Sequence, residues 1–336
     1  IIKNMKKNIL KKIFIKLSKF LGYEIIDQNT FTSPTLEKKL NDDLSIINQK
    51  SIILPLGEVK ITKKVSSILI IFRSNTNIEI WDQNKKRLFE NPKIEYTLRS
   101  LHSLIKSIKY FQKDNNNISI KIKIVDDQSK KEDLSKIDSL LENSKLKYEI
   151  ISLSHGKYKN IIKTQKKEQT FANLASLLQS FELAKDDKND LIFFLEDDYI
   201  HFVNMVKETI NSYQRISSQL NRDIFMCPTD YPYLYMENDK SNIFVGSDRH
   251  WRTVNKTLCS FITTNKLINK YWDNFQKTCS DRHEPFEKYL NKIYDEECCL
   301  SPLKTLSVHM TNINSSYGLS PFIDYKKLWD ENKYND

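Results

Sequence analysis

Two groups of acidic residues stand directly after apolar segments of this sequence. Asp126 and Asp127 follow the segment IKIV, and Glu196, Asp197 and Asp198 follow LIFFL. Adjacent carboxylates repel one another, so they are costly at the end of a buried strand unless a cation neutralises them. Carboxylate oxygens suit Mg²⁺ or Mn²⁺, whose other ligands are typically substrate phosphates. The two groups therefore indicate metal-assisted chemistry on a phosphate-bearing ligand, whereas either group alone would indicate a solvated turn or a helix N-cap.

Strand-like and helix-like segments alternate around these acids and predict how they are positioned. The expected strands are Ser67–Phe72, Ile118–Val125 and Leu191–Leu195, and the expected helices are Tyr96–Phe111, Asp133–Leu141 and Phe171–Leu183. Strands separated by helices form βαβ units and a mainly parallel sheet. Such sheets bind ligands beyond the carboxyl ends of their strands, where both acidic groups would lie. We therefore expect an α/β fold with a mostly parallel sheet flanked by helices.

At these residues the sequence resembles the nucleotide-sugar-dependent glycosyltransferases with the GT-A fold, in particular the inverting family 2. The segment VDDQS at 125–129 is similar to that family's V-D-D-G-S, and residues 171–199 are similar to its helix, strand and D-x-D motif. The resemblance covers Ser67–Tyr199 and implies transfer of a sugar from a nucleotide-diphosphate donor. Gln128 stands where the family motif has glycine, so the chain resembles a divergent member.

The resemblance also implies roles for individual residues. Asp126 and Asp127 would bind the base and ribose of the donor, while Glu196 and Asp198 stand in for the D-x-D motif. Asp198 would hold the Mn²⁺ or Mg²⁺ that bridges the diphosphate, and His309, after a short strand, is the expected histidine on the metal or diphosphate. The further residues expected to bind the nucleotide-sugar are Arg73, Ser74, Asp197, Arg249, Trp251 and Arg252.

Two polar clusters in the second half of the chain are candidates for the rest of the site. Asp248–Arg252 contains two arginines, a histidine and a tryptophan; guanidinium groups bind diphosphates in a bidentate way, and an indole can stack on a sugar. Inverting transfer needs a carboxylate that takes the proton of the acceptor hydroxyl. We expect Glu284 to be this base, Asp281 to be the second candidate and Asp295–Glu297 to be a rival cluster. The alternatives are a surface turn and a helix N-cap with a local arginine pair.

Composition excludes some classes and leaves others open. With 5 glycines in 336 residues, both G-x-G-x-x-G and the P-loop motif are absent. The 53 Lys and Arg against 43 Asp and Glu give a net charge of +10, which permits a nucleic acid, an anionic membrane or a polyphosphate ligand. A basic nucleic-acid-binding module is one alternative function, but the clustered carboxylates would repel phosphate without a metal, so no nucleic acid is expected. A catalytically inactive GT-A-like protein is the other alternative.

The N-terminal residues Met5–Leu21 have the pattern of a basic amphipathic helix, with apolar residues on one arc and lysines on the opposite one. It predicts peripheral contact with an anionic membrane, or else packing against its own domain or a partner subunit. The chain has no apolar run near the ~20 residues that span a bilayer, no signal-peptide core and no C-x-x-C pair among its 5 cysteines. We therefore expect a cytoplasmic protein, with a peripheral place on the inner face of the membrane.

The expected domain organisation has three parts. Residues 1–60 form the amphipathic helix and a linker, 61–310 form the GT-A-like domain, and 311–336 form a C-terminal tail. Within the domain, 61–200 is the nucleotide-binding half and 201–310 the acceptor half. The predicted function is metal-dependent transfer of a sugar from a nucleotide-diphosphate donor to a hydroxyl of a glycan or lipid-linked acceptor, with inversion.

Overall fold

The computed structural model describes residues 13–23, 50–53, 57–77, 89–164, 168–236, 240–310, 318 and 320–334. The chain divides into two units, residues 1–60 and residues 61–336. In the first unit, residues 13–20 are helical, and β1 (Lys50–Ile53) pairs antiparallel with β2 (Gly57–Lys60). The expected helix at Met5–Leu21 is thus described over its second half, and its residues 5–12 lie outside the described residues. Within the described ranges, no helix is long and apolar enough to cross a membrane.

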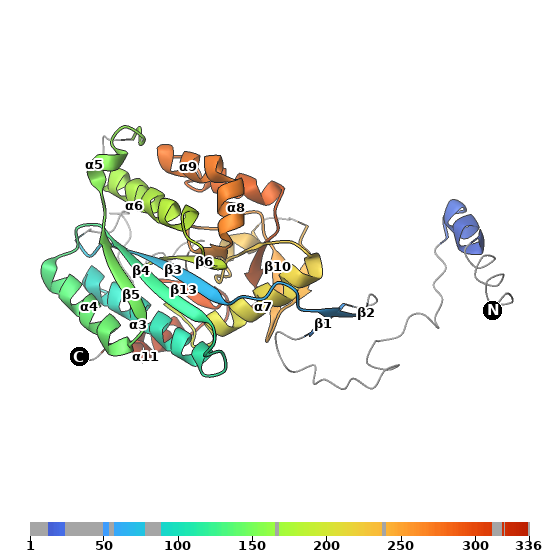
Figure 1. Ribbon diagram of the computed structural model, residues 1–336, viewed down its shortest axis with the longest axis horizontal. Helices are drawn as coiled ribbons and strands as arrows, with labels where there is room; N and C mark the ends of the chain where they lie inside the picture. Colours follow the sequence, from blue (N-terminus) through green and yellow to red (C-terminus); the bar gives the residue numbers. More distant parts are fainter. Residues whose placement is uncertain are drawn as a thin grey trace. The chain divides into compact units, whose positions relative to one another are not determined.

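The second unit is built on a large mixed sheet, drawn in Figure 1. In the described residues it has nine strands in the order β5-β4-β3-β6-β11-β8-β12-β10-β9. The first four strands are parallel, whereas β11 pairs antiparallel with β6. Their bounds are β3 (Ser67–Ser74), β4 (Ser119–Asp126), β5 (Lys147–Ser152), β6 (Leu191–Glu196), β8 (Phe225–Met226), β9 (Ile243–Val245), β10 (His250–Thr253), β11 (Phe261–Thr263) and β12 (Cys299–Pro302). The expected α/β fold with a mostly parallel sheet is confirmed.

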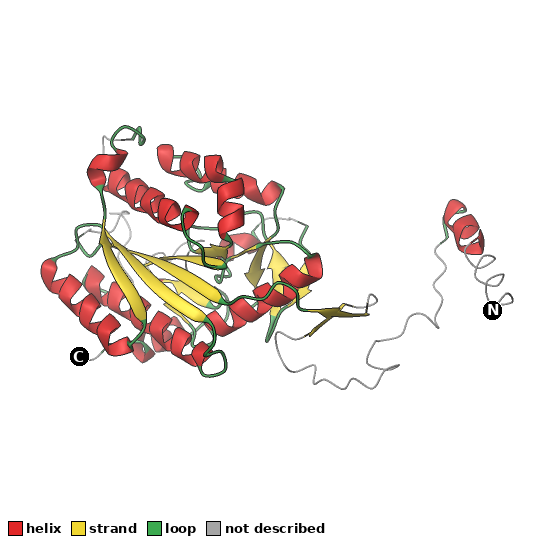
Figure 2. Ribbon diagram, in the orientation of Figure 1, coloured by secondary structure: helices red, strands yellow, loops and turns green. Residues whose placement is uncertain are grey.

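Helices cover both faces of this sheet, as Figure 2 shows. The central strand β3 is buried on both sides, which its unbroken apolar run predicted. Ile68, Ile70 and Phe72 belong to one core, while Leu69 and Ile71 belong to the other. The first core contains α3 (Lys93–Gln112), α4 (Lys131–Ser144) and α7 (Met205–Leu220), and the second contains α6 (Glu168–Lys185), α8 (Asn265–Lys270), α9 (Trp272–Ser280) and α10 (Lys288–Asn291). The remaining short helices are α5 (His155–Tyr158), η1 (Pro232–Tyr235) and η2 (Lys292–Asp295).

A small second sheet lies directly after β6. Strand β7 (Tyr199–His201) pairs antiparallel with β13 (Ser307–His309), and His309 lies opposite Tyr199. The backbone N–H of Met310 also donates to the carbonyl of Asp198 at 2.8 Å. This pairing carries residues from the end of the chain to the end of β6.

The C-terminal helix α11 (Tyr325–Glu331) packs on α3. Trp329 is buried, its ring is stacked on Phe89 with centroids 4.3 Å apart, and its carbonyl accepts a hydrogen bond from Arg99 at 2.6 Å. The Arg99 guanidinium also lies 4.4 Å from the centre of the Trp329 ring. The described residues 325–334 therefore contribute to the core of the second unit.

Candidate functional site

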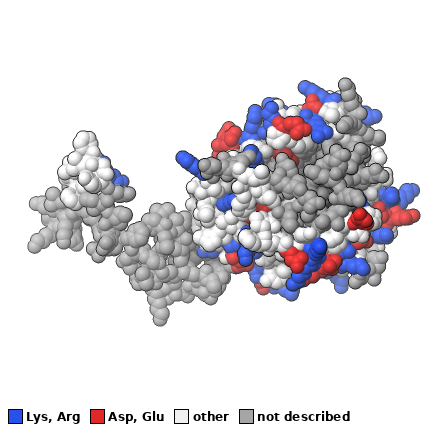
Figure 3. Space-filling model, turned by 180° about the vertical axis from the view of Figure 1, so that it is seen from behind, with Lys and Arg blue, Asp and Glu red and all other residues white. Residues whose placement is uncertain are grey.

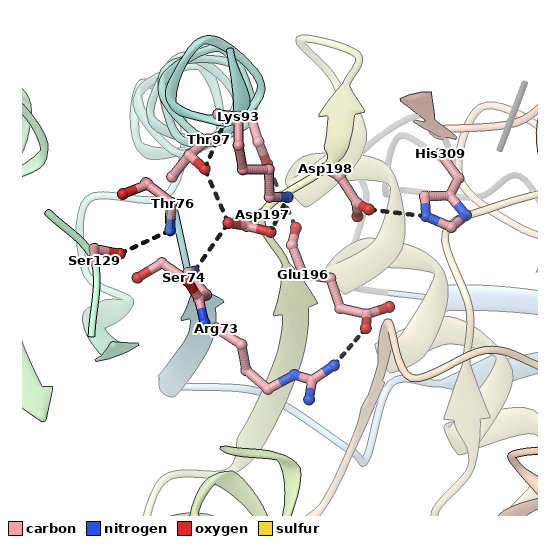
Figure 4. Close-up of polar contacts among 12 residues, drawn as sticks. Arg73, Ser74, Thr76, Lys93, Thr97, Ser129, Glu196, Asp197, Asp198 and His309 are labelled. Atoms are coloured by element: carbon pink, nitrogen blue, oxygen red, sulfur yellow. Dashed lines mark hydrogen bonds and ion pairs between the residues drawn. The ribbon is translucent and has the colours of Figure 1, made fainter. Parts of the chain in front are cut away.

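The three adjacent carboxylates at the end of β6 point to three different partners (Figure 4). Glu196 forms an ion pair with Arg73 at the end of β3. Asp197 is 2.6 Å from the Nζ of Lys93 on α3, and Asp198 faces His309 on β13. Each charge is thus matched by a separate group, which reduces the mutual repulsion that makes a run of acids costly.

Asp198 and His309 form the pair best placed to hold a metal. Oδ2 of Asp198 lies 3.1 Å from Nε2 of His309, and both side chains are largely buried. The His309 ring is stacked on Tyr199 at a centroid separation of 4.5 Å and an interplanar angle of 2°, which fixes its orientation. A carboxylate oxygen and an imidazole nitrogen side by side are chemically suited to Mn²⁺ or another divalent ion.

The structure does not bring Glu196 to this pair. Its carboxylate is turned to Arg73, whose other terminal nitrogen donates to the Asn173 side chain at 3.0 Å. Across the described ranges, no group of three or more His, Cys, Asp or Glu side chains is arranged to hold a metal ion. A metal bound by Asp198 and His309 would therefore take its remaining ligands from water and from a phosphate-bearing ligand, which is common for Mg²⁺ sites.

The end of β4 forms a second polar cluster at the same edge of the sheet. Ser74 donates to Asp126 at 2.8 Å, and Asn75 donates to Asp127 at 2.9 Å. The Nε2 of His155 lies 2.5 Å from the other oxygen of Asp127. Both carboxylates are buried, and β3 pairs with β4 so that Ser74 lies opposite Asp126. This arrangement brings Ser74, Asp126 and Asp127 together.

Gln128 follows these acids in a left-handed conformation. Its φ is 56°, a value that glycine adopts readily and that other residues adopt at a cost. Gln128, which stands at the glycine position of the V-D-D-G-S motif, therefore has a backbone conformation that glycine adopts readily. The turn it makes lets the backbone N–H of Ser129 donate to Asp126 at 3.1 Å.

Arg73 is the buried cation of the site. Burial lowers the pKa of Arg73, but Glu196 and the buried thiols of Cys259 and Cys279 oppose it, and the net pKa is raised above its ordinary value. Asp197 is held by two residues of α3: Lys93 forms an ion pair with it, and the Thr97 hydroxyl donates to it at 2.9 Å. Asp197 also accepts the backbone N–H of Asn75 at 3.2 Å, so it joins the ends of β3 and β6.

The two base candidates lie on the segment after α9. The Glu284 side chain is 82% exposed and lies 3.5 Å from Nε of Arg282. Asp281 is half-buried, and its carboxylate accepts the backbone N–H of Arg282 at 2.8 Å. Both carboxylates thus contact the neighbouring Arg282.

Glu287, three residues after Glu284, is the carboxylate that sequence reasoning missed. Burial raises its pKa to about 7, the Glu196 carboxylate adds to the rise, and His309 opposes it. The position of Glu287 depends on how the segment folds back after α9, which no local pattern in the sequence signals.

The Asp248–Arg252 cluster is occupied by contacts within the protein. The Trp251 ring is fully buried, and its indole N–H donates to Glu208 at 3.0 Å, so no ring face is accessible to a sugar. Arg249 donates to the carbonyl of Lys304 at 2.7 Å, and Arg252 is ion-paired with Asp230 at 2.7 Å. The structure thus gives these three residues partners on α7 and on neighbouring loops.

Asp295–Glu297, the rival acidic cluster, contacts the end of α8. Glu297 pairs with Lys270 at 2.6 Å and accepts the hydroxyl of Tyr271 at 2.8 Å, while Glu296 accepts the same hydroxyl at 3.0 Å. The other polar residues that sequence reasoning missed are Asn75, Lys93, Thr97 and His155. They are ordinary polar residues outside any motif, and only the tertiary fold brings them to the acids.

No protein-family model matches the sequence, and no curated protein matches it. The structure is similar to a fragment of TarS from S. aureus, with a TM-score of 0.42, 11% identity, 72% of this chain covered and 59% of that chain covered. It is also similar to the galactosyltransferase LgtC, solved with donor and acceptor sugar analogs (TM-score 0.36, 10% identity, coverage 67% and 70%). A third similar structure is UDP-glucose pyrophosphorylase complexed with UDP-glucose (TM-score 0.40, 8% identity, coverage 75% and 96%). These likenesses concern the fold alone.

Proposed function

We propose that this protein is a metal-dependent glycosyltransferase that moves a sugar from a nucleotide-diphosphate donor to a hydroxyl of a glycan or lipid-linked acceptor. The observation that carries the proposal is the contact between Asp198 and His309, 3.1 Å apart at the carboxyl end of β6. Asp126 and Asp127 end the parallel strand β4 two places along the sheet. An α/β sheet binds nucleotides at this edge, so one ligand could reach both clusters.

In this proposal each cluster has a separate task. Asp126 and Asp127, held by Ser74 and Asn75, bind the base and ribose of the donor. Asp198 and His309 hold Mn²⁺ or Mg²⁺, and a bound divalent ion would neutralise the charge that develops on the diphosphate as it leaves. The Tyr199 ring and the backbone contact from Met310 keep the two ligands in register.

A carboxylate from the segment after α9 takes the proton of the acceptor hydroxyl. The acceptor oxygen then forms a bond to the anomeric carbon, the bond from that carbon to the diphosphate breaks, and the nucleoside diphosphate leaves. Attack opposite the leaving group gives inversion. Glu287 is better suited to this task than Glu284 or Asp281, because a base works best when its pKa is close to the working pH and that of Glu287 is raised to about 7.

The face shown in Figure 3 and the side chains of the site favour this assignment over a nucleic-acid-binding module. On the face shown in Figure 3, acidic and basic side chains are interspersed over the described part of the second unit. Binding along a nucleic-acid backbone favours a continuous basic face. The candidate site contributes carboxylates, which attract phosphate only when a metal or arginine is bound between them.

A thermal-shift screen tests the proposal. The full chain is heated with UDP, GDP, CDP or dTDP, each with and without Mn²⁺, because a ligand that binds only the folded state raises its melting temperature. We expect one nucleotide to give a shift that depends on Mn²⁺ and is lost in Asp198→Asn. The exposed Asp295→Asn is the matched control and should keep the shift. If no nucleotide shifts the wild-type protein under either condition, the proposal is wrong.

A further inference from the structure

The helix of the first unit exposes an apolar face that the site does not use. The exposed fractions are 58% for Ile13, 59% for Phe14, 55% for Leu17, 87% for Phe20 and 62% for Leu21. At 100° per residue these five side chains fall within an arc of roughly 120°. Large apolar side chains gathered on one exposed face mark an interaction surface.

The charge around this face indicates what binds it. Lys16 lies beside the apolar arc and Lys19 lies on the opposite side of the helix, and residues 1–23 contain seven lysines and no Asp or Glu. Figure 3 shows the described part of this helix as mostly uncharged surface with basic atoms at its edge. The partner must therefore offer an apolar interior next to negative charge.

A second copy of the chain does not meet this requirement. Two such helices packed face to face would bury their apolar arcs but leave both sets of lysines without an acid in either segment to pair with. The like charges would repel one another across an exposed interface. An anionic lipid surface, by contrast, supplies acyl chains for the apolar arc and negative headgroups for the lysines.

We propose that the helix at residues 13–20, with Leu21, docks the protein on the surface of an anionic lipid bilayer. The helix lies parallel to the membrane plane, with Phe14, Leu17 and Phe20 below the level of the headgroups. Lys16 lies at that level, and Lys19 lies above it, on the side of the helix that faces the solution. Docking of this kind needs no spanning helix. The inference does not rest on the glycosyltransferase proposal, because it uses only residues of the first unit.

Co-sedimentation of the full chain with vesicles tests this inference. The vesicles are phosphatidylcholine alone or phosphatidylcholine with phosphatidylglycerol. We expect binding to the anionic vesicles that weakens as salt is raised, and much weaker binding to neutral ones. Lys16→Glu with Lys19→Glu should weaken binding at least about twentyfold, since each lysine near an anionic surface contributes about fivefold.

The apolar arc is tested by a second pair of substitutions. Leu17→Ser with Phe20→Ser should also weaken binding at least roughly tenfold, since it removes two of the side chains that enter the bilayer. Two controls are matched to these variants in the second unit. Lys131→Glu with Lys136→Glu makes the same charge change on exposed positions of α4, and Phe322→Ser removes a phenylalanine that is 96% exposed. Both controls should bind as the wild type does.

Three results would overturn the inference. These are equal binding to neutral and anionic vesicles, equal binding by the helix variants and the wild type, or equal losses in the controls and the helix variants. Self-association abolished by Leu17→Ser with Phe20→Ser, without vesicle binding, would assign the face to a second copy instead. The nucleotide thermal shift of each variant is measured in parallel, so failure of docking and failure of the proposed function are distinguished.

Discussion

His309 lies 3.1 Å from Asp198 although 111 positions separate them in the sequence. The contact exists because β7 follows β6 after a two-residue turn and pairs with β13 near the end of the chain. Asp198 lies in the turn after β6, the strand that ends the parallel part of the sheet, and His309 lies on β13, far along the chain. The site therefore depends on the packing of the two halves of the second unit.

The ion pair between Arg73 and Glu196 is predicted to stabilise the fold. Arg73→Ala would leave a partly buried carboxylate without its cation, which we expect to lower the free energy of unfolding by about 1–3 kcal/mol. Urea denaturation measures the loss. In a double-mutant cycle that combines Arg73→Ala with Glu196→Gln, the two losses of unfolding free energy should not be additive. Strictly additive losses would contradict the ion pair.

Trp251 is predicted to stabilise the fold without binding the sugar. Trp251→Phe keeps an aromatic ring but leaves a buried oxygen of Glu208 without the indole donor, so we expect a loss of about 1–3 kcal/mol in stability. The KM for the donor should stay unchanged. A raised KM with unaltered stability would show instead that the indole contacts the ligand.

Glu287 is predicted to set the pH dependence of transfer. Because burial raises its pKa to about 7, kcat/KM should rise with pH through this value and then level off as the carboxylate becomes fully ionised. The Glu196 and Glu284 carboxylates raise the pKa of Glu287 further, and His309 lowers it. Glu287→Gln should remove the rise and lower the rate by about 10²–10⁴-fold, whereas Glu284→Gln should have a much smaller effect. If the pH profile of Glu287→Gln is the same as that of the wild type, another carboxylate is the catalytic base.

The same pKa shift has a consequence for stability. The folded state binds a proton at Glu287 more tightly than the unfolded chain does, so this group stabilises the fold at low pH and the contribution is lost as pH rises through about 7. Glu287→Gln should therefore flatten the stability profile between its usual carboxyl pKa and neutral pH. Denaturation at several pH values measures the difference from the wild type.

Gln128 is predicted to be strained by its left-handed backbone. Gln128→Gly should raise stability by about 0.5–1 kcal/mol, because glycine adopts a φ of 56° without the cost that a β-carbon brings. Lys145→Gly at the end of α4, where φ is 60°, is a matched comparison at a position remote from the acids in sequence. A loss of stability in Gln128→Gly would mean that the glutamine side chain contributes more than its backbone costs.

The central strands could be predicted from the sequence because they are buried on both faces. The runs ILIIF and LIFFL are apolar without interruption, and the structure extends each to the polar residues that follow. Strand β5 was missed because KYEIIS is partly exposed at the edge of the sheet and mixes polar with apolar residues. The pairing of the short strands β7 and β13 was not predicted, because three-residue strands are defined by tertiary pairing more than by their own sequence.

The candidate site was predictable where a polar residue directly follows a buried strand. Asp126, Asp127 and Asp198 meet this condition, and the structure places them at the carboxyl edge of the sheet. The partners of these acids were not predictable, because they come from residues distant in sequence. For Trp251 the sequence was misleading. A tryptophan among polar residues suggested a ligand contact, but its indole N–H donates to Glu208, 43 positions earlier.

The most direct test is the coupling between metal and nucleotide at Asp198 and His309. Calorimetric titration of the nucleoside diphosphate selected by the screen is carried out with and without Mn²⁺ on the wild type, Asp198→Asn and His309→Gln. We predict that Mn²⁺ tightens nucleotide binding to the wild type by at least roughly tenfold and that either substitution abolishes this gain, in line with the 10–100-fold losses seen when metal sites are perturbed. Equal nucleotide affinity with and without Mn²⁺ in the wild type, or a full gain retained in Asp198→Asn, would contradict the account.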